Sequence, residues 1–413
     1  MDINSSRLPD LRSLFEQAVL AVQGKACVSD YLQQYPVTGD IYLLAIGKAA
    51  CSMAQGARNI LENQIKDNLV ITRHGYREPN LSGLNIIEAG HPFPDANSIE
   101  AGKQLIDFVQ ATPATGKLLC LISGGTSSLV EVLPDTISLD DLIQLNKWLL
   151  RSGLAIVDMN AIRKQVSCIK GGRLARYLQG REAIVLLMSD VQGDDPAIIG
   201  SGLLFPSQSH VPGEVLEKLP ATIQHILLQS PPFPDTDDPI FNTIKWQVIA
   251  NLSQAMRAAE YAANAKGYHV VVHQSCLQGD AIQCGKHLAR ILQAQPGILH
   301  IWGGEVTVNL PRNPGKGGRC QSLALSTAIE MRSKINWCLL AAGTDGSDGM
   351  MDAAGVCINS DSLAKAERKL AGDAKSYLDS ADAGTFFTAS GDLVITGSTG
   401  TNVTDLVFGY LDK

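Results

Sequence analysis

Short runs of apolar residues recur along the chain and end in glycine-rich or acidic turns. The runs cover residues 42–46, 69–72, 85–88, 117–122, 183–188, 269–273, 298–302, 337–341 and 393–396. Their continuous apolar character is typical of strands that helices cover on both faces, as in parallel sheets. Segments 140–154 and 254–266 have the spacing of helices that connect such strands. The pattern predicts an α/β protein with mostly parallel sheets flanked by helices.

One segment interrupts this pattern. Residues 229–238 read QSPPFPDTDD, and proline and aspartate at this density deny the chain a regular strand or helix. We expect a linker or hinge there. It would separate an N-terminal Rossmann-like α/β domain of residues 1–235 from a C-terminal α/β domain of residues 236–413. Whether the last residues pack back on the first domain is left open.

The composition excludes several classes of protein. The formal net charge is −7, so there is no basic excess to bind a phosphate backbone, and no nucleic-acid partner is expected. No apolar run is long enough to span a bilayer, and the N-terminus lacks the apolar region of a secretory signal. We therefore expect a cytoplasmic protein without a membrane partner. The nine cysteines include no C-x-x-C pair, which indicates reduced thiols and not a disulfide framework or a zinc site.

Glycine-rich turns after the predicted strands are the main chemical signal. They are IGKAA at 46–50, SGGTSS at 123–128, SDVQGDD at 189–195, GGEVT at 303–307, NPGKGGR at 313–319, AGTDGSDG at 342–349 and TGSTGTN at 396–402. Each alone could be a tight turn that needs glycine for steric reasons. Because ligands bind parallel sheets at the carboxyl ends of strands, so many turns together favour a large anionic ligand. Neither GxxxxGK[ST] nor a GxGxxG after a strand occurs, so the P-loop and the usual dinucleotide fingerprint are absent.

Two cations stand beside glycines in these turns. Lys48 opens a predicted helix, where the helix dipole disfavours a cation unless an anion occupies the helix end. Arg319 follows Gly317 and Gly318, which let the backbone approach a phosphate group while the guanidinium binds it. The segment KGGR at 170–173 repeats this arrangement. The alternative for each cation is a solvated or ion-paired side chain.

Acidic and imidazole side chains supply further candidates. Asp190 ends a predicted strand, where a carboxylate serves as a metal ligand, as a base or as a helix cap. Asp345 and Asp348 lie in GTDGSDG, which lacks calcium-loop spacing and leaves magnesium binding, a substrate hydroxyl or turn capping open. His91 lies in GHPFPDANS, a loop made rigid by two prolines, and could make a polar contact to a ligand.

The turns, taken in order, resemble the class II glycerate kinases, the glycerate 2-kinases. The matching segments are AIGKAA, GHPFPDANS, LISGGTSSLVEVLP, IRKQVSCIKGGRLA, SDVQGDDPAIIGSG, GGEVTV, GKGGRCQSLAL, AAGTDGSDGMMDAAG and GDLVITGSTGTNVTDL. They extend from about residue 40 to residue 407, nearly the whole chain. The C-terminal part resembles the MOFRL-type domain of that family.

The resemblance implies ATP-dependent phosphorylation of D-glycerate on its 2-hydroxyl, giving 2-phosphoglycerate and ADP. It implies ATP as co-substrate, Mg²⁺ or another divalent cation, and an active-site cleft between two α/β domains. Lys48, Asp190 and Arg319 match the positions with proposed catalytic roles in that family. Asp190 could hold the Mg²⁺ ion or take the proton of the hydroxyl group, and the sequence does not choose between these roles. Whether the chain forms a homodimer is left open.

The remaining candidates fall into two groups. Those expected to bind substrate or phosphate are His91, Ser123, Gly124, Gly125, Ser127, Ser128, Lys170, Gly171, Gly172, Arg173, Gly317 and Gly318. Those expected to bind nucleotide or metal are Gly303, Gly304, Glu305, Asp345, Asp348, Thr399, Thr401 and Asn402.

The sequence departs from the family pattern at a few positions. Cys320 and Ser322 replace the usual Asn and Glu after GKGGR, Leu203 replaces a proline after Ser-Gly, and Ser398 replaces a proline near the C-terminus. The first two substitutions leave the hydroxy-acid substrate open. Two other functions remain as alternatives: a hydroxypyruvate reductase-type oxidoreductase and a non-catalytic relative that binds a nucleotide or a sugar acid.

Overall fold

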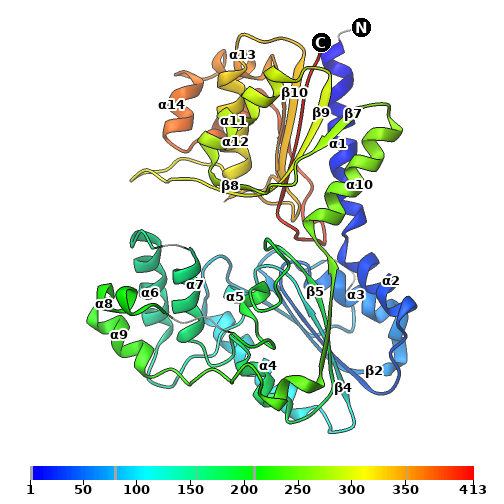
Figure 1. The fold of residues 1–413 in the computed structure, drawn as a ribbon, viewed down its shortest axis with the longest axis vertical. Helices are drawn as coiled ribbons and strands as arrows, with labels where there is room; N and C mark the ends of the chain where they lie inside the picture. The colour runs from blue at the N-terminus through cyan, green and yellow to red at the C-terminus, as the bar shows by residue number, and fades with distance from the viewer. Residues whose placement is uncertain (1–2, 79–80, 155, 208–210, 350) are drawn as a thin grey trace. The chain divides into compact units, whose positions relative to one another are not determined.

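The chain folds into two compact units, which Figure 1 shows as ribbons. The computed structural model describes residues 3–78, 81–154, 156–207, 211–349 and 351–413. One unit, here the central unit, is Gly24–Ala250, and the other, the terminal unit, combines Met1–Gln23 with Asn251–Lys413. No described helix is both long enough and apolar enough to cross a membrane.

The central unit is built on a parallel sheet of six strands with the order β3-β2-β1-β4-β5-β6. The strands are β1 (Ile41–Ile46), β2 (Ile65–Arg73), β3 (Ile86–Ala89), β4 (Lys117–Ile122), β5 (Ala183–Met188) and β6 (Ile244–Ala250). The chain reverses its direction of travel across the sheet between β1 and β4. In doubly wound folds ligands bind at this switch point, outside the carboxyl ends of the strands.

Helices cover both faces of the central sheet. They are α2 (Gly24–Gln34), α3 (Ala50–Leu61), α4 (Ala96–Ala111) and α5 (Thr126–Leu129), with the short helices η1 (Glu62–Gln64), η2 (Arg173–Leu178), η3 (Ile199–Ser201) and η4 (Pro239–Thr243). Asp95 and Ser98 form a capping box that starts α4. Leu105 of α4 is buried in one core cluster with Leu44 and Cys120, which are the residues that face it from β1 and β4.

A group of helices lies to one side of the central sheet (Figure 1). It consists of α6 (Leu139–Arg151), α7 (Ile156–Gln165), α8 (Gly213–Lys218) and α9 (Ala221–Leu228). The apolar face of α6, with Leu142, Leu145 and Leu149, packs against Ile162 of α7 in a small core of its own. Ser138 caps α6 through a capping box, which sets where that helix begins.

The terminal unit contains a mixed sheet with the strand order β12-β11-β10-β13-β9-β7, and β8 also pairs with β9. The strands are β7 (His269–Val272), β8 (Leu277–Asp280), β9 (Ile298–Thr307), β10 (Trp337–Gly343), β11 (Gly355–Asn359), β12 (Leu393–Val394) and β13 (Asp405–Leu411). β7 and β8 run parallel to β9, whereas β13 runs antiparallel to both β9 and β10. The last strand is therefore the inner strand that joins two parts of this sheet.

Helices also cover both faces of the terminal sheet (Figure 1). One face carries α1 (Ile3–Ala21) and α10 (Leu252–Ala265), and the other carries α11 (Ala281–Ala294), α12 (Arg319–Glu330), α13 (Ser362–Glu367), α14 (Ala374–Asp379) and α15 (Ala383–Ser390). Arg7 of α1 lies over the ring of Tyr410, 4.2 Å from its centroid, and Asp10 accepts a hydrogen bond from Tyr268 at 2.7 Å. These contacts and the buried Leu11 and Leu14 join the N-terminal helix to the C-terminal sheet.

The two-unit α/β architecture confirms the predicted fold class, and parallel pairing extends through the whole central sheet. The expectation of mostly parallel pairing fails in the terminal sheet, where β9 to β13 and β10 to β13, β11 to β10 and β12 to β11 pair antiparallel. The division of the chain lies elsewhere than the predicted boundary at residue 235. It falls after β6, because β6 pairs with β5 and so belongs to the central sheet. Residues 1–23 also join the terminal unit, because α1 packs on α10 and β10.

Candidate active site

The turns that follow the central strands meet at one edge of the sheet. β1 leads into Gly47 and Lys48, β4 into the turn 123–128, and β5 into Asp190. Because β1 and β4 pair in parallel with Ile46 beside Ile122, the first two turns are direct neighbours. The structure thus brings the turns of Lys48 and Ser123 together at the switch point of the fold.

The first of these turns has its backbone donors already bonded. The N–H of Lys48 donates to Gly124 O at 2.9 Å, and the N–H of Ala49 donates to Ser123 Oγ at 3.1 Å. The N–H of Gly47 donates to Ile71 O at 3.0 Å. In dinucleotide-binding folds the N–H groups of the corresponding turn hold the pyrophosphate. Here the neighbouring protein loop uses them instead.

The turn from β4 into α5 has the opposite character. In the part of the chain that the structure describes, the N–H groups of residues 124–127 have no hydrogen-bond acceptor. Gly125 has a φ of +88°, a conformation that favours glycine. A Cβ there would lie 3.1 Å from Lys48 Cγ and 3.1 Å from His91 Cδ2, so both side chains lie against this glycine. The turn therefore presents several N–H donors, and a lysine and a histidine side chain lie against it. This arrangement is suited to an anion.

The serine side chains of this turn have different surroundings. Ser123 Oγ is buried and accepts from Ala49 N, and Ser128 Oγ donates to Gly125 O at 3.2 Å. The Ser127 hydroxyl bonds the hydroxyl of Ser201 at 2.8 Å. Ser123 and Ser128 therefore hold the shape of the turn, and Ser127 ties it to the loop that follows β5.

Asp190 lies at the same edge of the sheet, at the end of β5. The preceding Ser189 fixes the backbone, because its N–H donates to Ala250 O at 2.9 Å and its hydroxyl to Val191 O at 3.2 Å. Among the described residues no group of three or more His, Cys, Asp or Glu side chains could hold a metal ion. A divalent cation at this edge would meet few protein carboxylates, which is usual for Mg²⁺ that arrives with phosphate groups.

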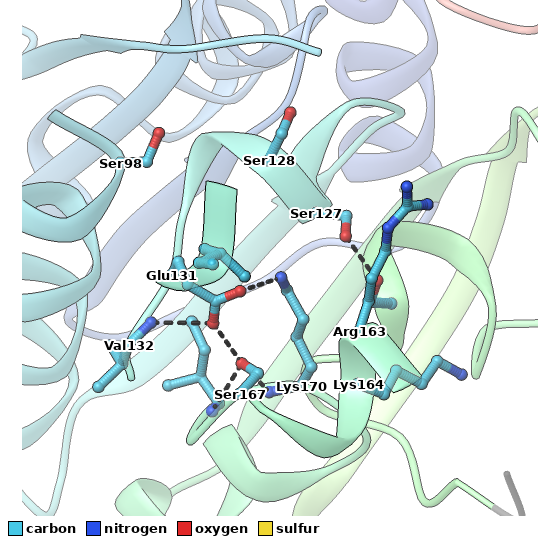
Figure 2. A network of polar contacts seen from close by, with 12 residues as sticks. Ser98, Ser127, Ser128, Glu131, Val132, Arg163, Lys164, Ser167 and Lys170 are labelled. Atoms are coloured by element: carbon cyan, nitrogen blue, oxygen red, sulfur yellow. Dashed lines mark hydrogen bonds and ion pairs between the residues drawn. The ribbon is translucent and has the colours of Figure 1, made fainter. Parts of the chain in front are cut away.

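Lys170, a predicted phosphate ligand, is bonded within the protein core. Figure 2 shows its ammonium group facing the carboxylate of Glu131, with which it forms an ion pair. Their side chains are only 3% and 1% exposed. Glu131 also accepts from the Ser167 hydroxyl at 2.5 Å and from Val132 N at 3.0 Å. The geometry assigns Lys170 to the support of the fold, because a phosphate could bind it only by displacing a buried carboxylate.

Arg173 is held in a similar way. Its guanidinium donates to the carbonyls of Lys164 and Ser167 at 2.7 and 2.8 Å, and to Pro231 O at 2.5 Å. The ring of Phe233 stacks on it with the centroid 3.8 Å from Cζ. Burial lowers the pKa of Arg173 to about 10. Gly171 and Gly172 let this segment pack closely, since a Cβ on either would collide with a phenylalanine ring. The predicted hinge at residues 229–238 lies inside the central unit, and its residues 231–233 are bonded to Arg173 there.

In the terminal unit, Arg319 is the first residue of α12 and bonds two carboxylates. Its Nε lies 2.5 Å from Asp405 Oδ2 and its Nη2 lies 2.9 Å from Asp405 Oδ1. Its Nη1 lies 2.5 Å from Glu305 Oε1. Although burial opposes it, the attraction of Asp405 holds the pKa of Arg319 well above its usual value. The arginine keeps its charge at any physiological pH.

Asp348 caps the same helix. Its carboxylate accepts from the N–H groups of Cys320 and Gln321 at 3.1 and 2.9 Å. Burial and the negative charge of Asp405 raise the pKa of Asp348 to about 7. Asp345 instead closes its own turn, by accepting from Ser347 N at 2.9 Å. The contacts of Asp348 and Asp345 are those of capping residues, which was one of the roles left open for them.

The other candidates of the terminal unit surround these groups or hold the sheet together. A Cβ on Gly318 would collide with the Asp348 carboxylate, so glycine lets the loop before α12 approach it. Gly304 has a φ of +141°, and a Cβ there would collide with the backbone of Leu277 in β8. Thr399 donates to Thr344 O at 2.5 Å and Thr401 to Val22 O at 2.7 Å. Three further candidates lie in the same loops and strands: Gly303, Gly317 and Asn402.

Family models match both units of the chain. Residues 10–224 match a family described as "Domain of unknown function (DUF4147)", and residues 298–405 match the MOFRL family. A D-glycerate 2-kinase from Thermotoga maritima is 35% identical over 386 residues, which are 90% of each chain. A crystal structure of a glycerate kinase from the same organism matches with a TM-score of 0.83 and 32% identity, and covers 98% of this chain and 100% of that one.

The chain belongs to the glycerate kinase family with a MOFRL domain. The family also includes a protein from Agrobacterium vitis with the name "Putative hydroxypyruvate reductase", which is 34% identical over 96% of this chain and 92% of that one. Names within the family therefore divide between phosphoryl transfer and hydride transfer. The hydrogen-bond donors of the site distinguish these two reactions.

Two of the substitutions within this glycerate kinase family pattern, Cys320 and Ser322, lie at the start of α12. Cys320 is buried, and burial raises the pKa of its thiol well above the usual value. Ser322 is also buried and donates to Gly318 O at 2.8 Å. Both side chains point into the protein, so they alter the support of the loop 313–318.

Sequence reasoning did not single out three residues that bond the candidates: Glu131, Asp405 and Ser201. All three lie inside segments that match the family: Glu131 in LISGGTSSLVEVLP, Ser201 in SDVQGDDPAIIGSG and Asp405 in GDLVITGSTGTNVTDL. Their presence there was the only signal for them. Their partners Lys170, Ser127 and Arg319 are 39, 74 and 86 residues away in the chain, and no spacing rule links residues at such separations.

Proposed function

We propose that the chain is an ATP-dependent kinase that phosphorylates D-glycerate on its 2-hydroxyl, giving 2-phosphoglycerate and ADP. The observation that carries this proposal is the turn from β4 into α5. Its N–H groups at residues 124–127 have no acceptor among the described residues, and it lies against Lys48 and His91, in a member of the glycerate kinase family. A small hydroxy acid and a phosphate group are both anions that such donors bind.

The proposed roles follow from what phosphoryl transfer requires. The transferred group needs in-line positioning and compensation of its spreading negative charge, and little covalent chemistry. Lys48 supplies a point charge beside the β4–α5 turn. Arg319 supplies a planar fork that can bind two phosphate oxygens at once. His91, whose ring lies against Gly125, is proposed to contact an oxygen of the bound acid.

Asp190 is the carboxylate proposed to accept the hydroxyl proton or to hold Mg²⁺. The cation, or another divalent ion in its place, would neutralise phosphate charge when bound. The donor set fits this role, because an ion that arrives with ATP needs only one or two protein carboxylates. Replacement of Asp190 by Asn distinguishes the two functions, since loss of a metal ligand raises the metal requirement while loss of a base lowers the rate alone.

Hydroxypyruvate reduction is the less favoured function. A nicotinamide dinucleotide bound in the usual way would need the N–H groups of the turn after β1. Those of Gly47, Lys48 and Ala49 donate to protein oxygens. Their engagement argues against a dinucleotide at this turn, whatever names its relatives carry.

A coupled assay of the purified protein tests the proposal. ATP, Mg²⁺ and D-glycerate should give ADP, and the product should be 2-phosphoglycerate and not the 3-isomer. Lys48→Ala should lower kcat by a factor on the order of 10². Oxidation of NADH by hydroxypyruvate, without ADP release, would show the reductase instead. Stabilisation by ATP and glycerate without turnover would show a binding protein.

A further inference from the structure

The two carboxylates that bond Arg319 differ sharply in burial. Asp405 is 5% exposed and binds the guanidinium through two nitrogens, Nε and Nη2. Glu305 is 51% exposed and contacts the guanidinium at Nη1. A buried bidentate pair is costly to break, because separation leaves an uncompensated charge in the protein. An exposed single contact costs little to break, because water replaces the partner.

The backbone around Asp405 is held in a fixed conformation. Thr404, the residue before it, has a φ of +74°, which is unusual for a β-branched residue. Thr344 holds that residue by two hydrogen bonds to Thr404 O, from its N–H at 3.0 Å and from its hydroxyl at 2.6 Å. Strain of this kind persists only where neighbours enforce it. It aims the Asp405 carboxylate from the start of β13 at Arg319.

Glu305 lies on the neighbouring strand, next to the residue that pairs with Asp405. Gly304 of β9 is the register partner of Asp405, and Glu305 follows it. A guanidinium has five N–H groups, and the contacts to Asp405 and Glu305 use three of them. An anion that binds the two terminal nitrogens side by side therefore competes with Glu305 for Nη1.

We infer that Asp405 is a positioning residue that stays on Arg319, and that Glu305 is the partner that an incoming phosphate group displaces. The inference rests on the proposed role of Arg319 in phosphate binding. It gives Glu305 a function other than nucleotide or metal binding: the carboxylate neutralises Arg319 until an anion replaces it. Glu305 then lowers the affinity of the empty site for phosphate groups.

Binding of inorganic tripolyphosphate, measured by titration calorimetry without metal, tests the displacement. Glu305→Gln should bind it about three- to fivefold more tightly than the unmodified protein, as expected when an exposed ion pair no longer competes. In an Arg319→Met background the same change should have no effect. Glu330→Gln is the control, since Glu330 is exposed at the other end of α12 and changes the net charge equally.

Two results would overturn the displacement. Weaker or unchanged binding by Glu305→Gln would show that the carboxylate does not compete with the anion. An equal gain in the Arg319→Met background would show a general charge effect. Because the readout is binding and not turnover, it stands apart from the proposed reaction. A protein without glycerate kinase activity could still show the exchange, and an active one could lack it.

The positioning role of Asp405 has a separate readout. Asp405→Asn should lower kcat with glycerate by a factor on the order of 10 to 100 while KM changes little, because the guanidinium loses its direction. Asp405→Glu, which restores the charge, should recover part of kcat. A folded Asp405→Asn protein with unchanged kcat contradicts the role. So does a loss of activity that only follows the loss of folded protein in circular dichroism.

Discussion

The tetrapeptide KGGR occurs in each unit, at 170–173 and at 316–319, with opposite surroundings. In the central unit its lysine and its arginine are both buried, and protein groups bond them. In the terminal unit Lys316 is exposed, and one of the two carboxylates that bond Arg319, that of Glu305, is 51% exposed. The same sequence signal therefore marks a structural support in one place and a candidate anion site in the other.

The difference comes from distant partners and not from the four residues. The segment 231–233 supplies two carbonyls and a ring to Arg173, and Glu131 supplies the counter-charge of Lys170. Around Arg319 the partners are two carboxylates, the buried Asp405 and the exposed Glu305, and Glu305 is the one that we infer an anion replaces. Glycines that let a phosphate approach also let a phenylalanine approach, so the motif by itself does not distinguish the two outcomes.

The largest expected effect on stability is at Lys170. Lys170→Met leaves Glu131 buried without its counter-charge and should lower the free energy of unfolding by about 3–5 kcal/mol. Urea denaturation measures this. Lys147→Met is the matched control, because Lys147 is exposed on α6, and it should change stability by less than about 0.5 kcal/mol. Adding Glu131→Gln to Lys170→Met should recover part of the loss. An effect no larger than that of the control would show that the pair does not support the fold.

The largest expected effect on activity is at Arg319. Arg319→Met should reduce kcat by a factor on the order of 10² to 10³ in the glycerate assay, because an interaction that strengthens as charge spreads over the transferred group is lost. Arg332→Met is the control. Arg332 is also an arginine of the terminal unit that pairs with a carboxylate, Glu367, but it lies in an exposed ion pair. Equal activity of the two variants would remove Arg319 from the site.

A smaller effect is expected in the pH dependence of the free energy of unfolding, and it concerns only the second KGGR segment. The pKa of Asp348, which caps the helix after the second KGGR, is raised to about 7. Between pH 4 and 7 the folded state keeps a proton that the unfolded chain has lost, so this contribution to stability is present below about pH 4 and is lost as pH rises through 7. Asp348→Asn removes it.

The comparison of the Asp348→Asn variant with the unmodified protein isolates that group. The pKa of His300 is lowered to about 4 by burial, so its contribution is lost as pH falls, in the opposite sense, but it is common to both proteins. The unfolding free energy of the unmodified protein should fall relative to the variant as pH rises from 4 to 7. Parallel curves would show that Asp348 is ionised throughout.

The smallest effect is expected at Lys316. Its side chain is exposed, and the bonds at this residue come from its backbone, which donates to Asp382 Oδ1 at 2.7 Å and accepts from Gly384 N at 2.8 Å. Lys316→Ala should therefore change the unfolding free energy by less than about 0.5 kcal/mol, against several for Lys170→Met. Equal losses at the two lysines would end the contrast between the segments.

Much of the central sheet could be predicted from the sequence. The runs 117–122 and 183–188 coincide with β4 and β5, because strands buried on both faces are apolar throughout. β6 escaped notice because its side chains are largely exposed or half-buried, and β8 because LQGD is polar and pairs through a glycine. β13 is wholly buried, yet it pairs with strands far away in the chain, so its place in the sheet had no local signal.

The candidate site was predictable only in part. The turns at the carboxyl ends of β1 and β4 could be foreseen, since parallel strands bring such turns to one edge. The sequence could not show which N–H donors of these turns remain for a ligand, because that depends on hydrogen bonds between the turns. The N–H of Lys48, for instance, donates to the carbonyl of Gly124 in the neighbouring turn. The same limit applies to Lys170 and Arg319, whose partners lie far away in the chain.

The most direct test replaces each KGGR arginine by lysine and measures stability and turnover on both proteins. Arg319→Lys keeps the charge and loses the fork, so kcat should fall at least tenfold while the unfolding free energy changes by less than about 2 kcal/mol. Arg173→Lys should lose about 3 kcal/mol or more, since several carbonyls lose their donor, yet keep its kcat wherever it is folded. The reverse pattern, or a loss of both properties in both variants, would contradict the account.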